Sequence, residues 1–418
     1  MGIFRNGAKQ IKNKWKIIGP GFITGASDND PSAITTYTQA GAKFGLQFLW
    51  ASIITYPLTV AILEMCARIG LTTNMGLMSV IKIFYSKTLL YFIGIISFVA
   101  ILLNISVDIE MVGSVAHLLY SMIPSFIYSI IFSGLLVYSI IMWSYNKIIS
   151  VLKILCIALL SYAIIPFLTK TNWEDVGKSI FIPVFKSNTE YFLVLVAIFG
   201  SAISPYLFFW QASVEIEEAE LSKKSFDQKR LKRVYRDIKG GIFFTNFISF
   251  FIMLSAANVL FRAGINNVET LDEAAMALKP LAGKLSYLLF AAGIIGTGLL
   301  AVPVLAGSLC YIMTETFGWE RGLNKKLHEA KEFYLTLISS LIIGTSLHFL
   351  KINPIKALIG VAVLYGIIAP ILVMIILIIA NNKKIMGIYT NSKWANFWGI
   401  LAFLVMFFSV IILLYLHK

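Results

Sequence analysis

Charged side chains are scarce in this sequence: Asp, Glu, Lys and Arg together make up 13% of its 418 residues, whereas hydrophobic residues make up 58%. Charged residues supply about 25% of an ordinary soluble domain, so the composition excludes a typical water-soluble protein. The hydrophobic residues form blocks of roughly 20, the length of a helix that spans a lipid bilayer. The sequence therefore predicts an all-α integral membrane protein that has the lipid bilayer as its main partner.

Cysteine and histidine are also scarce, with three and four copies. Cys66, Cys156 and Cys310 lie far apart and show no spacing typical of a disulfide or of metal ligation. The histidines are scattered, so a transition-metal site built from imidazoles is not indicated. A glycine-rich phosphate-binding loop is missing, which argues against a pump driven by ATP. We therefore expect neither an enzyme nor a bound cofactor.

Eleven hydrophobic blocks can be counted, and each is expected to form a transmembrane helix. Their approximate bounds are 17–43, 46–69, 89–118, 123–145, 149–168, 190–214, 239–262, 283–313, 333–350, 354–381 and 395–416. Residues 1–16 form a basic head without a signal-peptide cleavage pattern.

The net charge of +14 is concentrated in this head and in three connections, 215–238, 314–332 and 382–394. If the eleven helices are threaded alternately, all four segments fall on one side, which the positive-inside rule makes cytoplasmic. Anionic lipid headgroups then account for the basic residues without nucleic acid as a partner. We expect the plasma membrane of a prokaryote, with the N-terminus in the cytoplasm and the C-terminus outside.

The blocks divide into two groups of five, residues 17–168 and 190–381, with 395–416 as an additional helix. An odd number of helices per group places the second group upside down, as in an inverted repeat. The first and sixth blocks are interrupted at corresponding places, by Ser27-Asp28-Asn29-Asp30-Pro31-Ser32 and by Gly200-Ser201-Ala202-Ile203-Ser204-Pro205. Paired interruptions of this kind mark the substrate site of many transporters.

The first interruption places Asp28 and Asp30 at the depth of the bilayer centre, where a carboxylate is costly without a partner. Pro31 removes a backbone donor and disfavours helix at the preceding residue. Unwound carbonyl groups beside a carboxylate are typical of a cation site with oxygen ligands. The competing interpretation is a proline kink with a capping Asp30, and Asp28 as a vestibule charge.

The sixth block adds the carbonyl groups of Ser201 and Ala202 and the hydroxyl of Ser204. The third block carries Asp108 and Glu110, which lie two positions apart and therefore face different directions.

Two further expectations concern charged residues outside the interruptions. Glu64 and Arg68 should form an ion pair, since they are four residues apart, and Glu315 should lie at the membrane interface.

Several segments resemble the NRAMP family of divalent metal transporters. They are GPGFITGASDNDPSAITTYTQAGAKFG at 19–45, EMCARIG at 64–70, MVGS at 111–114, ETFGW at 315–319 and NNKKIMG at 381–387. The resemblance runs nearly the whole chain and implies the LeuT-type fold of five plus five inverted helices. It also implies that the acidic metal ligand falls on Asp30. A monomer is expected.

Departures from the family pattern suggest a different cargo. The family's metal-binding Asn is replaced by Ala33, and its Met-Pro-His motif becomes Ser204-Pro205-Tyr206. The third-helix Asp of the family aligns with Val107, next to Asp108. Because a thioether favours soft metals, its loss suits a hard, partly hydrated Mg²⁺. The pattern resembles the NRAMP-related magnesium transporters.

The candidate metal site thus comprises two carboxylates and the residues around the two interruptions. Its members are Asp28, Asp30, Ala33, Ser201, Ala202 and Ser204, with Ser32, Gln39, Asp108, Glu110 and Tyr206 as further candidates along the transport path. The leading hypothesis is import of Mg²⁺, and also Mn²⁺, without proton coupling. The alternatives are a proton-coupled Mn²⁺/Fe²⁺ importer, a carrier of organic solutes with the same fold, and a membrane sensor without transport.

Overall fold

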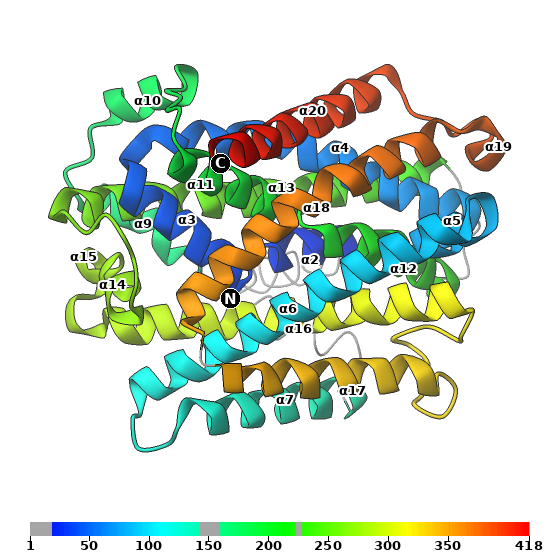
Figure 1. Cartoon of the computed structure of the whole chain (residues 1–418), viewed down its shortest axis with the longest axis horizontal. Helices are drawn as coiled ribbons and strands as arrows, with labels where there is room; N and C mark the ends of the chain where they lie inside the picture. The colour runs from blue at the N-terminus through cyan, green and yellow to red at the C-terminus, as the bar shows by residue number, and fades with distance from the viewer. Residues whose placement is uncertain (1–18, 143–158, 223–227, 351, 418) are drawn as a thin grey trace, which may run out of the picture.

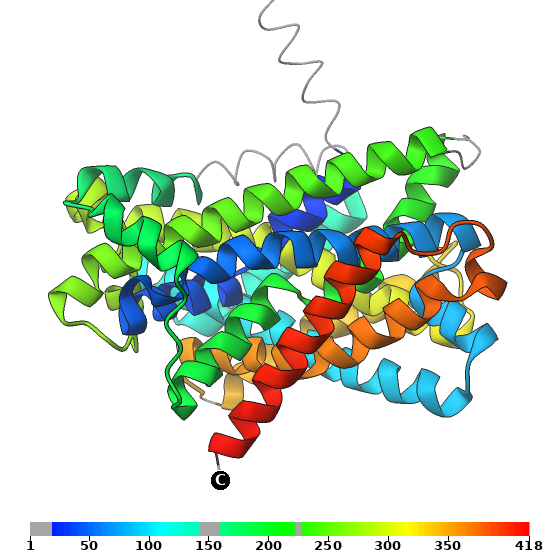
Figure 2. The same ribbon diagram turned by 90° about the horizontal axis from the view of Figure 1, so that it is seen from above.

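The computed structural model describes residues 19–142, 159–222, 228–350 and 352–417. Within these ranges every regular element is a helix, so the expected all-α architecture is confirmed. The basic head, Cys156 and most of the expected block 149–168 lie outside the described residues. Figure 1 shows long helices that run roughly side by side, and Figure 2 shows the same bundle from above.

Long helices form the body of the bundle. They are α4 (Leu49–Thr73), α6 (Lys87–Leu119), α7 (Ser125–Met142), α13 (Gln228–Val259), α16 (Ser286–Phe317), α17 (Lys331–Ser346), α18 (Pro354–Asn381) and α20 (Lys393–Leu416). By length and hydropathy, eight stretches of the described residues can cross a membrane. This number is lower than eleven for three reasons. The first two blocks join into one stretch from Pro31 to Thr73, α17 has only 16 residues, and most of 149–168 is not described.

Short helices cap the two ends of the bundle. One end in Figure 1 carries α5 (Leu77–Phe84) and α19 (Lys383–Met386). The other end carries α10 (Trp173–Phe181), α14 (Leu271–Met276) and α15 (Lys279–Ala282), while α9 (Ser161–Leu168) follows the undescribed segment. The long helices therefore run between these two ends.

The first hydrophobic block contains two helices, α2 (Pro20–Ser27) and α3 (Pro31–Phe44). Pro31 occupies the first turn of α3, where its missing N–H costs nothing, and Asp30 is the N-cap. The sixth block likewise contains α11 (Thr189–Ala202) and α12 (Pro205–Ser222). Both interruptions lie within the bundle, so local proline chemistry places extended backbone deep in the protein.

Glycines allow the interrupted helices to pack closely against their neighbours. A Cβ on Gly25 of α2 would lie 2.3 Å from the carbonyl carbon of Gly241 in α13. A Cβ on Gly200 of α11 would lie 2.0 Å from the carbonyl oxygen of Ala362 in α18. Small residues at such crossings let helix backbones touch, as is common in membranes. These contacts fix α2 on α13 and α11 on α18.

Three expectations concern charged residues and the connections that hold them. The Glu64–Arg68 ion pair is confirmed, with Nε and Oε1 2.8 Å apart. Glu315 lies in the last turn of α16 and is 4% exposed, and its place at the membrane interface stays a prediction. The connection expected at 215–238 is wrong in part, because α12 continues to Ser222 and α13 begins at Gln228. Hydropathy ends α12 too early because it counts the buried Glu215 and Glu217 as polar, and it starts α13 too late because the first turns of that helix are rich in Lys and Arg.

Candidate functional site

Asp30 is held by two hydrogen bonds that use both of its carboxylate oxygens. Its Oδ1 accepts the backbone N–H of Ala33 at 2.7 Å, as an N-cap does. Its Oδ2 accepts the side-chain amide of Asn104 from α6 at 3.0 Å. The side chain is 3% exposed. A carboxylate fixed in this way points its remaining lone pairs in defined directions.

Asp28 joins the first interruption to the second. Its Oδ1 accepts the Ser204 hydroxyl at 2.9 Å, and Asp28 is 1% exposed. The same hydroxyl also lies 3.0 Å from the carbonyl oxygen of Ser201, and one proton serves one acceptor at a time. The Tyr206 hydroxyl donates to the Ser27 carbonyl at 2.9 Å. Side chains of the second interruption thus satisfy part of the unwound backbone and one carboxylate of the first.

Within the part of the chain that the structure describes, several buried polar atoms near these carboxylates have no hydrogen-bond partner. They are Asp28 Oδ2, both amide atoms of Asn29, Asn104 Oδ1, both carboxylate oxygens of Asp108, Ser201 Oγ and the Tyr365 hydroxyl. Buried polar groups nearly always have a partner in proteins, whether protein, water or ion. Most of these atoms are oxygens, the ligands that hard dications prefer. The region is therefore chemically suited to a cation with some of its water.

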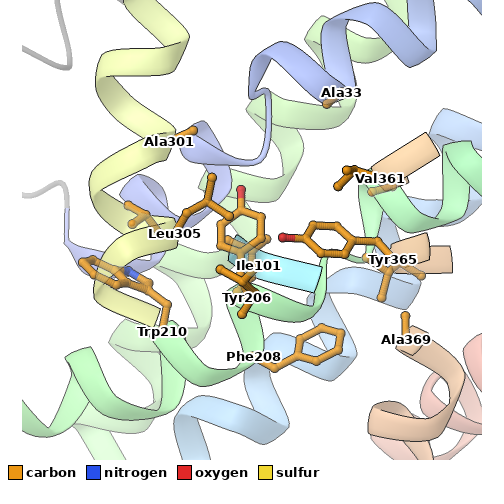
Figure 3. Packing of buried hydrophobic residues seen from close by; sticks show 14 of the residues in the cluster. Ala33, Ile101, Tyr206, Phe208, Trp210, Ala301, Leu305, Val361, Tyr365 and Ala369 are labelled. Carbon is orange, nitrogen blue, oxygen red and sulfur yellow. The ribbon is translucent and has the colours of Figure 1, made fainter. Parts of the chain in front are cut away.

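Asp108 approaches the first interruption from α6, one helical turn beyond Asn104. It is fully buried, and it lies close enough to Asp30 for the two charges to interact. The backbone amide of Ser32 also faces Asp108 without meeting hydrogen-bond geometry. In Figure 3 the hydroxyl of Tyr365 on α18 points toward Tyr206, and the two ring centroids lie 6.2 Å apart. Helices α3, α6, α12 and α18 therefore all contribute to one polar region.

Other predicted residues have different roles. The Ala202 carbonyl accepts the Thr59 hydroxyl at 2.9 Å, so it is already engaged. The Ser32 hydroxyl donates to the Leu358 carbonyl at 3.0 Å, which ties α3 to α18. Gln39 holds the loop before α14, since its Oε1 accepts the Val268 amide at 2.8 Å. These bonds tie the three candidates to neighbouring segments, and their part in a metal site stays a prediction.

Glu110 turns away from the polar region. Its Oε1 lies 3.5 Å from Nδ1 of His348, a residue that follows α17. The prediction that Asp108 and Glu110 face different directions is confirmed, because Asp108 is fully buried beside Asp30 and Glu110 is partly exposed.

Sequence reasoning missed a second polar network, which holds the start of α2. Thr24 donates to Gln211 at 2.6 Å, and Gln211 donates to Glu215 at 2.8 Å. The carboxylate of Asp237 on α13 accepts the backbone N–H of Gly19 at 3.0 Å. Polar residues at the ends of apolar blocks were the available signal, but their partners lie about 200 residues away in the chain.

Asn29 and Tyr365 were also missed. Asn29 lies inside the first interruption and is fully buried, so its place between the two aspartates was a usable signal. Tyr365 lies in the apolar helix α18 and offered none. Within the described ranges, no three His, Cys, Asp or Glu side chains converge as metal ligands. A bound ion would therefore depend on one or two carboxylates together with neutral oxygens.

Comparison with known proteins agrees with this architecture. Residues 21–416 match the family model described as natural resistance-associated macrophage protein-like, or Nramp. The chain is 25% identical to the divalent metal cation transporter MntH of Clostridium acetobutylicum, over 98% of this chain and 92% of that protein. It is 23% identical to MntH of Caldanaerobacter subterraneus, over 94% and 91% respectively.

Solved structures share the fold at low sequence identity. A manganese transporter of Eremococcus coleocola superposes with a TM-score of 0.72 at 17% identity, covering 97% of this chain and 87% of that one. MhsT in complex with L-phenylalanine superposes with a TM-score of 0.61 at 14% identity, covering 93% and 98%. These likenesses confirm the fold class that the sequence predicted. With a family match over nearly its whole length, the chain belongs to the Nramp family of multi-pass membrane transporters.

Proposed function

We propose that this protein imports divalent metal cations, with Mg²⁺ as the main cargo and Mn²⁺ as a second one, and without proton coupling. The observation that carries the proposal is Asp28 beside Asp30 at an interrupted helix, among buried oxygens that lack hydrogen-bond partners. The names of the MntH relatives support a divalent cation as cargo. The metal is substrate here, and no cofactor is needed.

The preference for Mg²⁺ follows from the ligand types. Ser204 stands where the family resemblance places a methionine, and Ala33 stands where it places an asparagine. Without a thioether, soft metals lose their advantage over hard ones. Without the asparagine, fewer protein ligands replace water, and Mg²⁺ characteristically keeps several waters beside one or two carboxylates. Asp28, Asp30 and the hydroxyl of Ser204 provide such a site.

The ion would enter down its electrical gradient. A dication gains about 2 × 2.3 kcal/mol per 100 mV of membrane potential, so proton coupling is not required for uptake. In this proposal the head and the end that carries α5 and α19 face the cytoplasm, and the C-terminus lies outside. The membrane is the plasma membrane of a prokaryote, and the protein works as a monomer.

Uptake into proteoliposomes tests the proposal. Mg²⁺, Mn²⁺ and Ca²⁺ entry are followed separately while the internal pH is recorded. We expect Mg²⁺ entry without acidification, and we expect Asp30→Asn to abolish it because a neutral amide replaces the fixed carboxylate. Asp272→Asn, which changes an exposed carboxylate on α14, serves as the matched control. Normal Mg²⁺ uptake by Asp30→Asn would remove the site assignment.

A second candidate is a proton-coupled Mn²⁺/Fe²⁺ importer, which the structural likeness to a manganese transporter favours. Metal competition separates the two. Excess Mg²⁺ should block Mn²⁺ uptake if the main proposal is right. It should have little effect, and Mn²⁺ entry should acidify the vesicles, if the second candidate is right.

A further inference from the structure

An apolar groove lies on the outer surface of the bundle between α6 and α16. Its volume is about 240 Å³, and it is lined by Tyr91, Ile95 and Phe98 of α6 and by Met313 and Phe317 of α16, among others. Tyr91, Ile95 and Phe317 are exposed. The lining residues are almost all apolar, so the groove suits a flexible hydrocarbon chain.

The groove wall on α6 ends at a lysine. Lys87, Tyr91, Ile95 and Val99 recur every four residues and therefore lie along one face of the helix. Lys87 is the first residue of α6 and is exposed. The same helical face thus presents a cation at one end and an apolar wall along the rest.

A second lysine reaches the same end from α5. The Nζ of Lys82 lies 3.1 Å from the position that a Cβ on Gly318 would occupy, and Gly318 directly follows the lining residue Phe317. Among the described residues, neither Lys82 nor Lys87 forms an ion pair. Trp319 stacks on Phe317 with ring centroids 4.9 Å apart, and tryptophan is typical of the membrane–water interface. The end of the groove therefore lies at headgroup level.

We propose that this groove binds a phospholipid with an anionic headgroup. One acyl chain lies between α6 and α16, and the headgroup phosphate lies between Lys82 and Lys87. The apolar wall requires a lipid rather than free phosphate, and the two unpaired lysines favour an anionic lipid over a zwitterionic one. Basic residues at the cytoplasmic surface attract anionic lipids in general, but here they sit at the mouth of a defined groove.

The lipid would also hold α5 in place. Glu315 of α16 accepts the backbone N–H of Met78 at the start of α5 at 3.1 Å and the hydroxyl of Ser213 on α12 at 2.7 Å. A headgroup bound to Lys82 would fasten the other end of α5 to α6 and α16. The bound lipid therefore stabilises the contact of α5 with α16 and with α12, the helix that follows the second interruption.

Native mass spectrometry of the full chain with phosphatidylglycerol or phosphatidylcholine tests this site. We expect phosphatidylglycerol to be retained preferentially. The double variant Lys82→Gln/Lys87→Gln should weaken its binding roughly fivefold per lysine, or about 25-fold in total. The control variant Lys383→Gln/Lys384→Gln changes two exposed lysines of α19 and should leave phosphatidylglycerol binding unchanged.

A third variant tests the apolar part of the site. Val99→Phe enlarges an exposed side chain in the groove and should reduce retention of both lipids. The proposal is overturned if the Lys82/Lys87 variant keeps phosphatidylglycerol as the native chain does, or if both lipids bind equally. It is also overturned if Val99→Phe leaves lipid retention unchanged.

Discussion

The Ser204 hydroxyl donates a 2.9 Å hydrogen bond to Asp28 Oδ1, and this bond joins two helical interruptions that lie 176 positions apart in the chain. The bond places a neutral donor on one oxygen of a buried carboxylate and leaves Oδ2 without a partner. Asp28 thus has one oxygen fixed by the protein and one available to a cation. The two halves of the molecule meet at the point where the cargo is proposed to bind.

This relationship predicts different results for the two partners. Ser204→Ala removes a neutral hydrogen bond, which costs about 1 kcal/mol, and we expect Mg²⁺ affinity to change only a few-fold. Asp28→Asn removes a charge from the site, and we expect at least a tenfold loss of affinity. Isothermal titration of the purified variants with Mg²⁺ measures both. Equal losses in the two variants would mean that Asp28 acts only as the acceptor for Ser204.

Selectivity should follow the ligand types at two positions. Ser204→Met with Ala33→Asn introduces a thioether and an amide, and softer metals gain from the thioether. We expect uptake of Mn²⁺ or Cd²⁺ to rise relative to Mg²⁺ by about tenfold or more, which is about 1.4 kcal/mol. Competition assays in proteoliposomes measure the ratio. Ser204→Ala with Ala33→Asn is the control without sulfur, and the same ratio in both double variants would count against a role for the thioether.

Asp108 should affect the rate of Mg²⁺ transport more than the affinity of the site for Mg²⁺. It is buried without a hydrogen-bond partner and interacts with the charge of Asp30, but the described residues place no further carboxylate with these two as a ligand cluster. Asp108→Asn is expected to slow Mg²⁺ uptake several-fold while Mg²⁺ affinity stays within a few-fold of the native value. If the native chain acidifies the vesicles and this variant does not, Asp108 carries protons and the second candidate function is right.

The stability of the first turn of α2 should depend on Asp237. Its carboxylate accepts the amides of Gly19 and Phe22 at 3.0 and 3.2 Å, which satisfies two donors at the helix N-terminus. Loss of such a cap costs about 1 kcal/mol. We expect Asp237→Ala to increase hydrogen exchange in α2 and to lower the melting temperature slightly. Asp237→Asn keeps an acceptor and should have a smaller effect. Unchanged exchange in Asp237→Ala would show that α13 does not hold α2 through this residue.

The sequence predicted the positions of the two helical interruptions, but not the contacts that join them to the rest of the bundle. Asp30, Pro31 and Pro205 act on their own helices, because a proline fixes the first turn and an aspartate caps it. The partners of these residues depend on how the helices pack. The bond from Asn104 to Asp30 spans 74 positions, and no local pattern encodes it.

The charged residues illustrate the same limit. Glu64 and Arg68 were paired correctly because a helix brings residues four apart together. Glu217 was assigned to a loop, yet it is 7% exposed and accepts the Leu323 amide at 3.0 Å. Hydropathy cannot distinguish a solvated glutamate from one that binds backbone amides of a distant segment.

The glycine crossing of α2 and α13 leaves no room for a side chain between the two helices. At Gly25 and Gly241 the two backbones are in direct contact, and the Thr245 hydroxyl donates to the Gly25 carbonyl nearby. Because no side chain separates the two backbones at this crossing, we expect α2 and α13 to move together if cargo is released past α2. The crossing lies one helical turn before Asp28, whose backbone N–H donates to the Gly25 carbonyl at 3.1 Å. Any shift of α13 would therefore be transmitted directly to the first interruption.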